Sequence, residues 1–278
     1  MQRPHSTAIA LGLVLAISTG QLATAQSPEE AQASTPPRSG VTMPRSANAD
    51  PIVTEGVIED GAIDAIKEMS NYLMSAKTLA ITTHSSLDVV TNDGQRIQLD
   101  GTTTYKARRP GFVIDYESNI KSRRFIYDGK NFTVYSPKLG YYATVPAPGT
   151  NREVLDTIYN KFGIALPLED LFRWGDGTNS DRIQALKSAY EVGSATIDGV
   201  DTDHFAFREE DVDWEVWIQK GDQPWPRKFV IVDRTDPARP TFTARLTWQM
   251  NPPFTDADFA FVPDANAKRI QLATFKGE

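Results

Sequence analysis

Cysteine is absent from the 278 residues of this sequence. Its absence excludes disulfide bonds, and it also excludes a lipid anchor attached to an N-terminal cysteine of a mature chain. The chain must therefore rely on an apolar core for its stability, and its length is ample for such a core.

Patterns typical of catalysis and of metal binding are also missing. His84 and His204 are the only histidines beyond the N-terminal region, and each lies in a different predicted strand. There is no Gly-x-Ser-x-Gly nucleophile elbow, no zinc-ligand spacing and no phosphate-binding glycine loop. The acidic run Asp198–His204 reads as a hairpin turn, because it lacks the terminal glutamate of a calcium loop. We predict a non-catalytic protein without cofactor or metal, and a histidine-dependent hydrolase is the less favoured alternative.

Long hydrophobic runs are missing as well. The apolar segment Ala8–Ile17 is too short to span a bilayer, and no later segment is apolar enough to cross one. Arg3 precedes this segment, and the small-x-small sequence Ala23-Thr24-Ala25 follows it. This arrangement predicts a cleavable signal peptide over residues 1–25 and a protein that is exported and does not span the membrane. For an exported chain without disulfides, the bacterial periplasm is the expected compartment.

An excess of positive charge is lacking too. The formal net charge of −7 argues against nucleic-acid binding. Residues 106–124 are locally basic, however, and they leave two interpretations open. The cations are either solvated charges that protect the strand edges from pairing, or they form a rim that attracts anions. They are Lys106, Arg108, Arg109, Lys121, Arg123 and Arg124.

The remaining composition indicates one folded domain. Residues 26–55 contain proline, serine and charged residues but no aromatic residue, so they are expected to be a disordered linker. Residues 56–278 read as a single β-rich domain. Apolar spacing predicts a helix over 61–75, and a capping box at Thr150–Glu153 predicts another that stops at Gly163. A short Leu- and Trp-rich helix is expected over 166–174.

Alternating apolar and polar residues predict two blocks of strands around these helices. The first block occupies residues 79–145, where turns such as Asp128-Gly129 separate β-rich runs. The second block occupies residues 188–250 and ends in a strand with strict alternation from Thr241 to Met250. Ten or eleven antiparallel strands are too many for a flat sheet. We therefore expect a mainly β, α+β fold: a strongly curved sheet or incomplete barrel with a concave apolar face.

Two passages carry a resemblance to known families. Lys106 to Tyr116 contains an Arg-Pro pair that leads a strand, and Tyr127 to Pro137 contains an Asp-Gly-Lys hairpin before a Tyr-x-Pro turn. Together with the ending Asp258-Phe-Ala-Phe-Val-Pro263, they resemble the periplasmic outer-membrane lipoprotein carriers (LolA- and LolB-like). The chain is more closely similar to a family of predicted periplasmic proteins of unknown function that is thought to share this fold.

The resemblance implies an incomplete β-barrel with short helices as a lid over a hydrophobic cavity. In the carriers, the arginine of the Arg-Pro pair bonds to the lid and holds it closed; Arg109 matches that position, and Arg108 is an additional cation. The residues that we expect on the apolar face of the cavity are Phe112, Ile114, Tyr116, Trp214, Val216, Leu246 and Trp248.

These expectations lead to two hypotheses for function. The first is a periplasmic protein that binds or carries a lipid, a lipoprotein acyl chain or another hydrophobic ligand. The second is an envelope sensor or regulatory domain that binds a partner protein through the same sheet. An apolar face of this size requires a cover in either case, and the two hypotheses differ in what provides it.

Overall fold

The structure is a computed structural model that describes residues 56–164, 166 and 180–274. The predicted signal peptide, the predicted linker and nearly all of the helix expected at 166–174 lie outside the described residues. No described helix combines the length and the apolar character that crossing a lipid bilayer requires.

One sheet of 12 strands dominates the described part of the chain. Its spatial order is β12-β6-β5-β4-β3-β2-β1-β11-β10-β9-β8-β7, so it is unclosed, with β12 and β7 at its two edges. Neighbouring strands are antiparallel except β12, which runs parallel to β6. This confirms the expected mainly β, curved sheet; the strand missed by the sequence is β12, which is only two residues long.

The strands occur in two blocks along the chain. Those of the first block are β1 (Leu79–Val90), β2 (Arg96–Ala107), β3 (Phe112–Ser118), β4 (Ser122–Tyr127), β5 (Asn131–Ser136) and β6 (Tyr141–Pro146). Those that follow are β7 (Ser188–Ile197), β8 (Val200–Arg208), β9 (Val212–Gln219), β10 (Pro226–Asp233), β11 (Thr241–Met250) and β12 (Lys268–Arg269).

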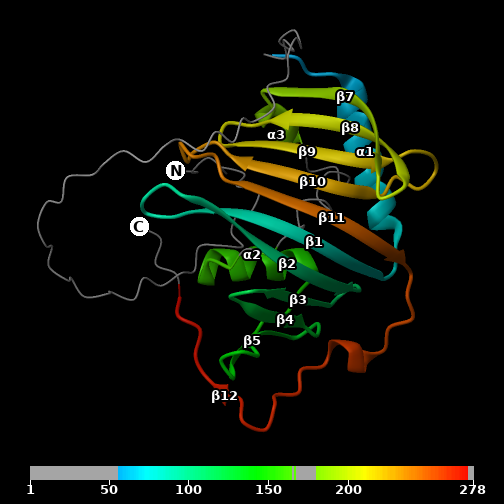
Figure 1. Cartoon of the computed structure of the whole chain (residues 1–278). Coiled ribbons are helices and arrows are strands. Elements are labelled where there is room, and N and C mark those ends of the chain that lie inside the picture. The colour runs from blue at the N-terminus through cyan, green and yellow to red at the C-terminus, as the bar shows by residue number, and fades with distance from the viewer. Residues whose placement is uncertain (1–55, 165, 167–179, 275–278) are drawn as a thin grey trace, which may run out of the picture.

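The two blocks meet in the middle of the sheet. β1 pairs with β11 from Leu79↔Met250 to Leu87↔Phe242, and β1 pairs with β2 on its other side. Apart from β12, each block then extends outward by hairpins, so that strands adjacent in sequence are adjacent in the sheet (Figure 1). Because directly opposite residues share a face, this register places the apolar positions of all these strands on one continuous surface.

Two helices lie on the concave face, each over one half of the sheet (Figure 1). α1 (Asp60–Ser75) matches the helix expected at 61–75 and covers the half formed by β7 to β10. α2 (Asn151–Phe162) covers the other half; it begins at the capping box of Thr150 and Glu153 and ends at Gly163 in the left-handed conformation. A short α3 (Ser180–Ala185) precedes β7.

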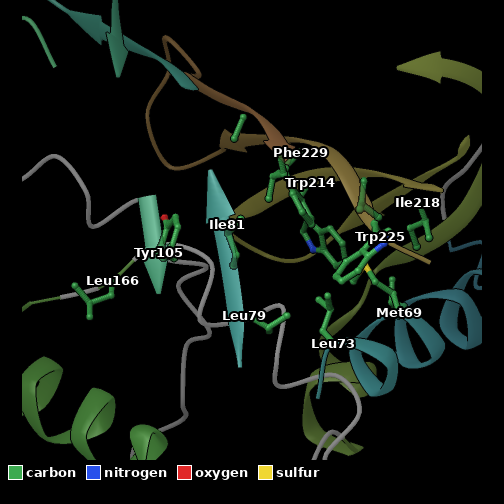
Figure 2. Packing of buried hydrophobic residues seen from close by; sticks show 14 of the residues in the cluster. Met69, Leu73, Leu79, Ile81, Tyr105, Leu166, Trp214, Ile218, Trp225 and Phe229 are labelled. Atoms are coloured by element: carbon green, nitrogen blue, oxygen red, sulfur yellow. The ribbon is translucent and has the colours of Figure 1, made fainter. Parts of the chain in front are cut away.

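The main core fills the space between the sheet and these helices. Met69 and Leu73 of α1 pack toward Trp225 and Ile218, as Figure 2 shows. Tyr72 of α1 meets the Trp225 ring edge-on at 4.9 Å between centroids. The aromatic face of the second block is therefore covered by a segment of the same chain.

Part of the opposite face of the first block is covered by the C-terminal strap, defined as residues 251–270. A short 3-10 helix, η2 (Asp256–Phe259), places the Phe259 side chain against Val113 and Ile126 of β3 and β4. β12, at the end of the strap, then pairs with β6 in parallel. The first three residues of β3, Phe112 to Ile114, are consequently buried on both faces of the sheet, and all three are apolar.

We predict that the strap depends on one aromatic anchor. Phe259→Ala removes a fully buried ring and should lower the free energy of unfolding by about 3–5 kcal/mol. The control is Val262→Ala on the same strap, where the side chain is 81% exposed and the change should stay within about 0.5 kcal/mol. Urea denaturation followed by tryptophan fluorescence measures the free energy of unfolding of both variants. Equal losses in the two variants would contradict the role of Phe259 as the anchor of the strap.

A second prediction concerns acid stability. The Lys106 ammonium and the Thr255 amide donate hydrogen bonds to the Asp258 carboxylate at 2.7 and 2.9 Å, and they lower the pKa of this carboxyl to about 2. An unfolded aspartate has a pKa of about 3.9. The contribution of Asp258 to stability is therefore complete above about pH 4 and is lost as the pH falls through 2.

Urea midpoints across pH check this expectation. The midpoints of the Asp258→Asn variant and the unmodified protein should differ at neutral pH and converge between about pH 4 and pH 2. Asp222→Asn, at an exposed position in the β9–β10 turn, serves as the control and should run parallel to the unmodified protein. A difference for Asp258→Asn that is undiminished at pH 2 would contradict the role of this carboxylate.

Candidate ligand-binding cavity

A cavity of about 640 Å³ opens on the concave face, between the C-terminal end of α1 and the N-terminal end of α2. Its volume lies within the range of small-ligand sites. The sheet contributes β1, β2, β3 and the β2–β3 turn. The described lining residues are Met74, Ala76, Lys77, Thr78, Leu79, Ile81, Tyr105, Lys106, Ala107, Arg108, Arg109, Pro110, Phe112, Ile114, Gly149, Thr150, Asn151, Arg152, Leu155 and Leu166.

The floor of the cavity is set by strand register. Ile81, Tyr105 and Ile114 lie opposite one another on β1, β2 and β3, and Leu79 and Phe112 lie in the next row, on either side of Ala107. The strands thus bring apolar side chains from three separate sequence segments onto one patch, and four of these five side chains are aliphatic or phenyl groups without polar atoms. Figure 2 shows Leu79 and Ile81 on β1, with Tyr105 and Leu166 on one side of that strand.

Tyr105 is the polar exception on this floor. Burial is the main influence on its hydroxyl, and it raises the pKa of the phenol far above the ordinary value. The side chain is therefore neutral at every physiological pH. The floor offers a hydroxyl group but no charge to a bound molecule.

The β2–β3 turn joins both helices at the mouth of the cavity. Arg109 donates from Nη2 to the Met74 carbonyl in the last turn of α1, at 2.6 Å. Asn151, the first residue of α2, accepts from the Gly111 amide at 2.7 Å and donates to the Arg108 carbonyl at 2.7 Å. One turn therefore fixes the positions of both helix ends that flank the opening.

The two adjacent arginines in this turn point to opposite faces of the sheet. Arg109 turns toward the cavity, whereas the Arg108 guanidinium lies 4.2 Å from the centre of the Phe259 ring on the strap side and bonds to Asp256. Lys106 likewise reaches Asp258 on the strap. These pairs neutralise two of the six cations noted in the sequence.

Other cations of residues 106–124 are also engaged on the sheet. Arg124 forms a two-point pair with Asp115, and Arg123 donates to the Ser136 hydroxyl at 2.6 Å. A broad rim of six free cations is therefore not formed. Arg109 is the member of that group directed at the cavity mouth.

The structure brings only part of the predicted apolar set to the cavity. Phe112 and Ile114 line it. Tyr116 lies on the same face farther along β3, where its ring covers Gly101; a Cβ at Gly101 would stand 3.0 Å from the Tyr116 Cε2 atom. The glycine leaves room for this ring.

The remaining predicted residues lie on the same face but pack in the main core. Trp214 stacks on Phe207 at 3.9 Å between ring centroids, and Val216 and Leu246 are buried in the cluster to which α1 contributes. Trp248 is half-buried, stacks against Trp225 and donates from its indole to the Pro226 carbonyl at 2.7 Å. None of these four is among the described residues that line the cavity.

Several lining residues were missed by sequence reasoning. The alternation of apolar residues in the sequence places Leu79 and Ile81 on one face of β1. Alternation alone does not tell whether such a face lines a cavity or packs in the core. Tyr105 and Ala107 end β2 next to the Arg-Pro turn, and Leu155 belongs to the apolar stripe of α2. Their proximity arises only when β1, β2 and α2 assemble.

Both histidines lie on the outer face, away from the cavity. His204 stacks on Trp217 at 3.9 Å between centroids and bonds through Nε2 to Glu215 at 2.7 Å. His84 lies 3.4 Å from the Thr102 hydroxyl oxygen. Within the described ranges there is no group of three or more His, Asp or Glu side chains suited to a metal ion.

Comparison with known proteins identifies the family. A family model described as predicted periplasmic protein (DUF2092) matches residues 62–273, and the chain belongs to this family. The match includes all but the first two residues of α1, the whole sheet and the C-terminal strap. No curated protein matches the chain.

Similar solved structures include an uncharacterised conserved protein from Thermus thermophilus, with 11% identity, a TM-score of 0.46, and coverage of 76% of this chain and 99% of that one. The lipoprotein LppX from Mycobacterium tuberculosis has 12% identity, a TM-score of 0.41 and coverage of 71% and 99%. A LolA superfamily protein from Nitrosomonas europaea has 8% identity, a TM-score of 0.34 and coverage of 72% and 97%. With TM-scores below 0.5, these likenesses identify no ligand and no shared site.

Proposed function

We propose that this protein binds the long apolar chain of a lipid or lipoprotein in the cavity between α1 and α2 and carries it through the periplasm without chemical change. The observation that carries the proposal is the 640 Å³ cavity whose floor is apolar and uncharged. Membership of a family of predicted periplasmic proteins supports the compartment. Residues 1–25 would be the signal peptide that delivers the chain there.

Burial of hydrocarbon supplies the driving force for such binding. Each methylene group removed from water stabilises the complex by about 0.8 kcal/mol. A chain of sixteen carbons therefore gains about 12 kcal/mol from burial, and a cost of about 4 kcal/mol for association and ordering would leave the roughly 8 kcal/mol that micromolar binding requires. A carrier must also release its ligand, which requires that the flanking helices can separate.

A sensor that binds a partner protein through the same sheet is less well supported. Such a partner would need an exposed apolar face, but α1 and α2 already cover the concave side and the strap covers part of the other. What is left open on the concave side is a cavity of small-ligand size, which favours a single chain over a protein surface.

Arg109 is proposed to act as a latch on the cavity mouth. Its guanidinium bonds to the Met74 carbonyl and so connects the β2–β3 turn to the end of α1. While this bond is formed, α1 and the sheet stay together at one side of the opening. Its loss would let that side open without changing the apolar floor.

The first test of the function fills the cavity. Ala107→Phe places a ring on the floor between Leu79 and Phe112, and it should abolish binding of the neutral apolar dye N-phenyl-1-naphthylamine. Organic extracts of protein purified from the periplasm should contain a lipid for the unmodified protein, and mass spectrometry should find it depleted in the variant.

The matched control for that test is Ala260→Phe, at an exposed position on the strap. Because Ala260 lies on the other side of the sheet, dye binding should be unchanged. Equal binding by the two variants, or extracts without lipid together with no dye binding by the unmodified protein, would contradict the proposed function.

The second test concerns the latch. Arg109→Leu should speed the release of bound N-phenyl-1-naphthylamine about three- to tenfold, the value of one hydrogen bond from a charged donor at an exposed site. Stopped-flow dilution of the loaded protein measures the rate. Arg234→Leu, which removes an arginine bonded to the Glu209 and Glu210 carbonyls far along the chain, is the control. An unchanged release rate for Arg109→Leu would reject the latch.

A further inference from the structure

The cavity is lined by charge of one sign. Five of its described lining residues are cationic, namely Lys77, Lys106, Arg108, Arg109 and Arg152, and none of them is acidic. The whole chain carries a formal net charge of −7. The charged residues that line this opening therefore favour an anionic group, and the strength of that preference depends on which of them already have acidic partners.

Two of these cations are already neutralised. Lys106 pairs with Asp258, and Arg108 pairs with Asp256, both on the strap side of the sheet. Lys77 and Arg109, in contrast, have no acidic partner among the described residues. The positive charge that a ligand meets at the α1 side of the mouth therefore comes from these two side chains.

Lys77 and Arg109 belong to the same edge of the opening. The Arg109 guanidinium bonds to the Met74 carbonyl, and Lys77 follows Met74 by three residues in the segment that leads from α1 into β1. Both residues are exposed. One Arg109 nitrogen is used by the Met74 bond, which leaves other N–H donors of the guanidinium for a ligand.

The floor of the cavity is apolar and uncharged, in contrast to the positively charged mouth. Leu79, Ile81 and Ile114 are buried hydrocarbon, and burial keeps Tyr105 neutral. An anion on this floor would lose its hydration without gaining a charged partner, which is costly. A bound molecule is therefore required to be apolar at the inner end and is favoured if it is anionic at the mouth.

We infer that the cavity takes an amphiphile whose long apolar chain ends in an anionic head group, a carboxylate or a phosphate, and that Lys77 and Arg109 hold this head at the rim. The inference deepens the proposed function and rests on it. Ammonium and guanidinium groups both donate charge-assisted hydrogen bonds to carboxylate and phosphate oxygens. The same chemistry serves a free fatty acid and the phosphate of a phospholipid.

Three ligands with the same sixteen-carbon chain test the head group. Palmitate, hexadecyl phosphate and hexadecanol compete with N-phenyl-1-naphthylamine for the full chain, each below its aggregation concentration. We expect at least one anionic ligand to bind about tenfold more tightly than hexadecanol, and this preference should shrink as salt is added. Whichever anion binds more tightly identifies the source of the head group, and either result supports the inference.

Variants assign the effect to the rim. Lys77→Met should weaken binding of the preferred anion about three- to tenfold while changing that of hexadecanol less than about twofold, because the inference places the Lys77 ammonium next to the head group alone. Lys67→Met removes one positive charge from α1 outside the cavity lining and should leave both affinities unchanged. Lys77→Met is the decisive variant, since Arg109 also holds α1.

Each outcome separates the inference from the proposed function. Equal affinity for the three ligands would overturn the anionic head group and leave the apolar cavity intact. Equal losses in Lys67→Met and Lys77→Met would also overturn it, by showing a general charge effect. Failure of all three ligands to displace the dye, together with extracts free of lipid, would reject the proposed function itself.

Discussion

The pairing of β1 with β11 is the contact on which the rest of the structure depends. It joins two strand blocks whose paired residues, such as Leu79 and Met250, are separated by most of the domain. Without it, each block would be a set of hairpins with one uncovered apolar face. With it, the blocks form one curved sheet, and β1 becomes a central strand flanked by β2 and β11. Long-range pairing of this kind is slow and entropically costly, so the surface that it buries must offset that cost.

The curved sheet creates a concave face that two helices cover only partly. α1 and α2 cover opposite halves, and the cavity lies between their facing ends. The β2–β3 turn holds both ends through Arg109 and Asn151. Gly111 is required within this turn, because its φ is +133° and a Cβ would stand 2.9 Å from the Arg108 Nε atom. Residues 108–111 thus position the helix ends on both sides of the opening.

The same turn also separates charge between the two faces. Arg108 bonds to the strap, whereas Arg109 faces the mouth of the cavity. A neutral floor below a cationic edge suits a ligand with an apolar chain and an anionic head, and the connection of the edge to α1 provides a means of controlling release. Arg109 is therefore proposed both to bind the head group and to hold α1 in place. Lys77 is proposed to bind the head group only, so a change at Lys77 measures head-group binding without affecting the latch.

Local pattern in the sequence was sufficient for most of the elements, although α3 and the two-residue β12 were not predicted. Strict alternation predicted β11, apolar spacing predicted α1, and the Thr150–Glu153 capping box predicted the start of α2, because these signals depend on neighbours within a few residues. The tertiary structure decided the rest. Alternation placed Trp214 and Phe112 on the same face of the sheet. In the structure, α1 packs over Trp214, whereas Phe112 lines the cavity. Adjacent Arg108 and Arg109 differ in role because the strap and α1 approach the turn from opposite sides. A strand's period determines which face a side chain occupies, whereas its cover comes from segments far away in the chain.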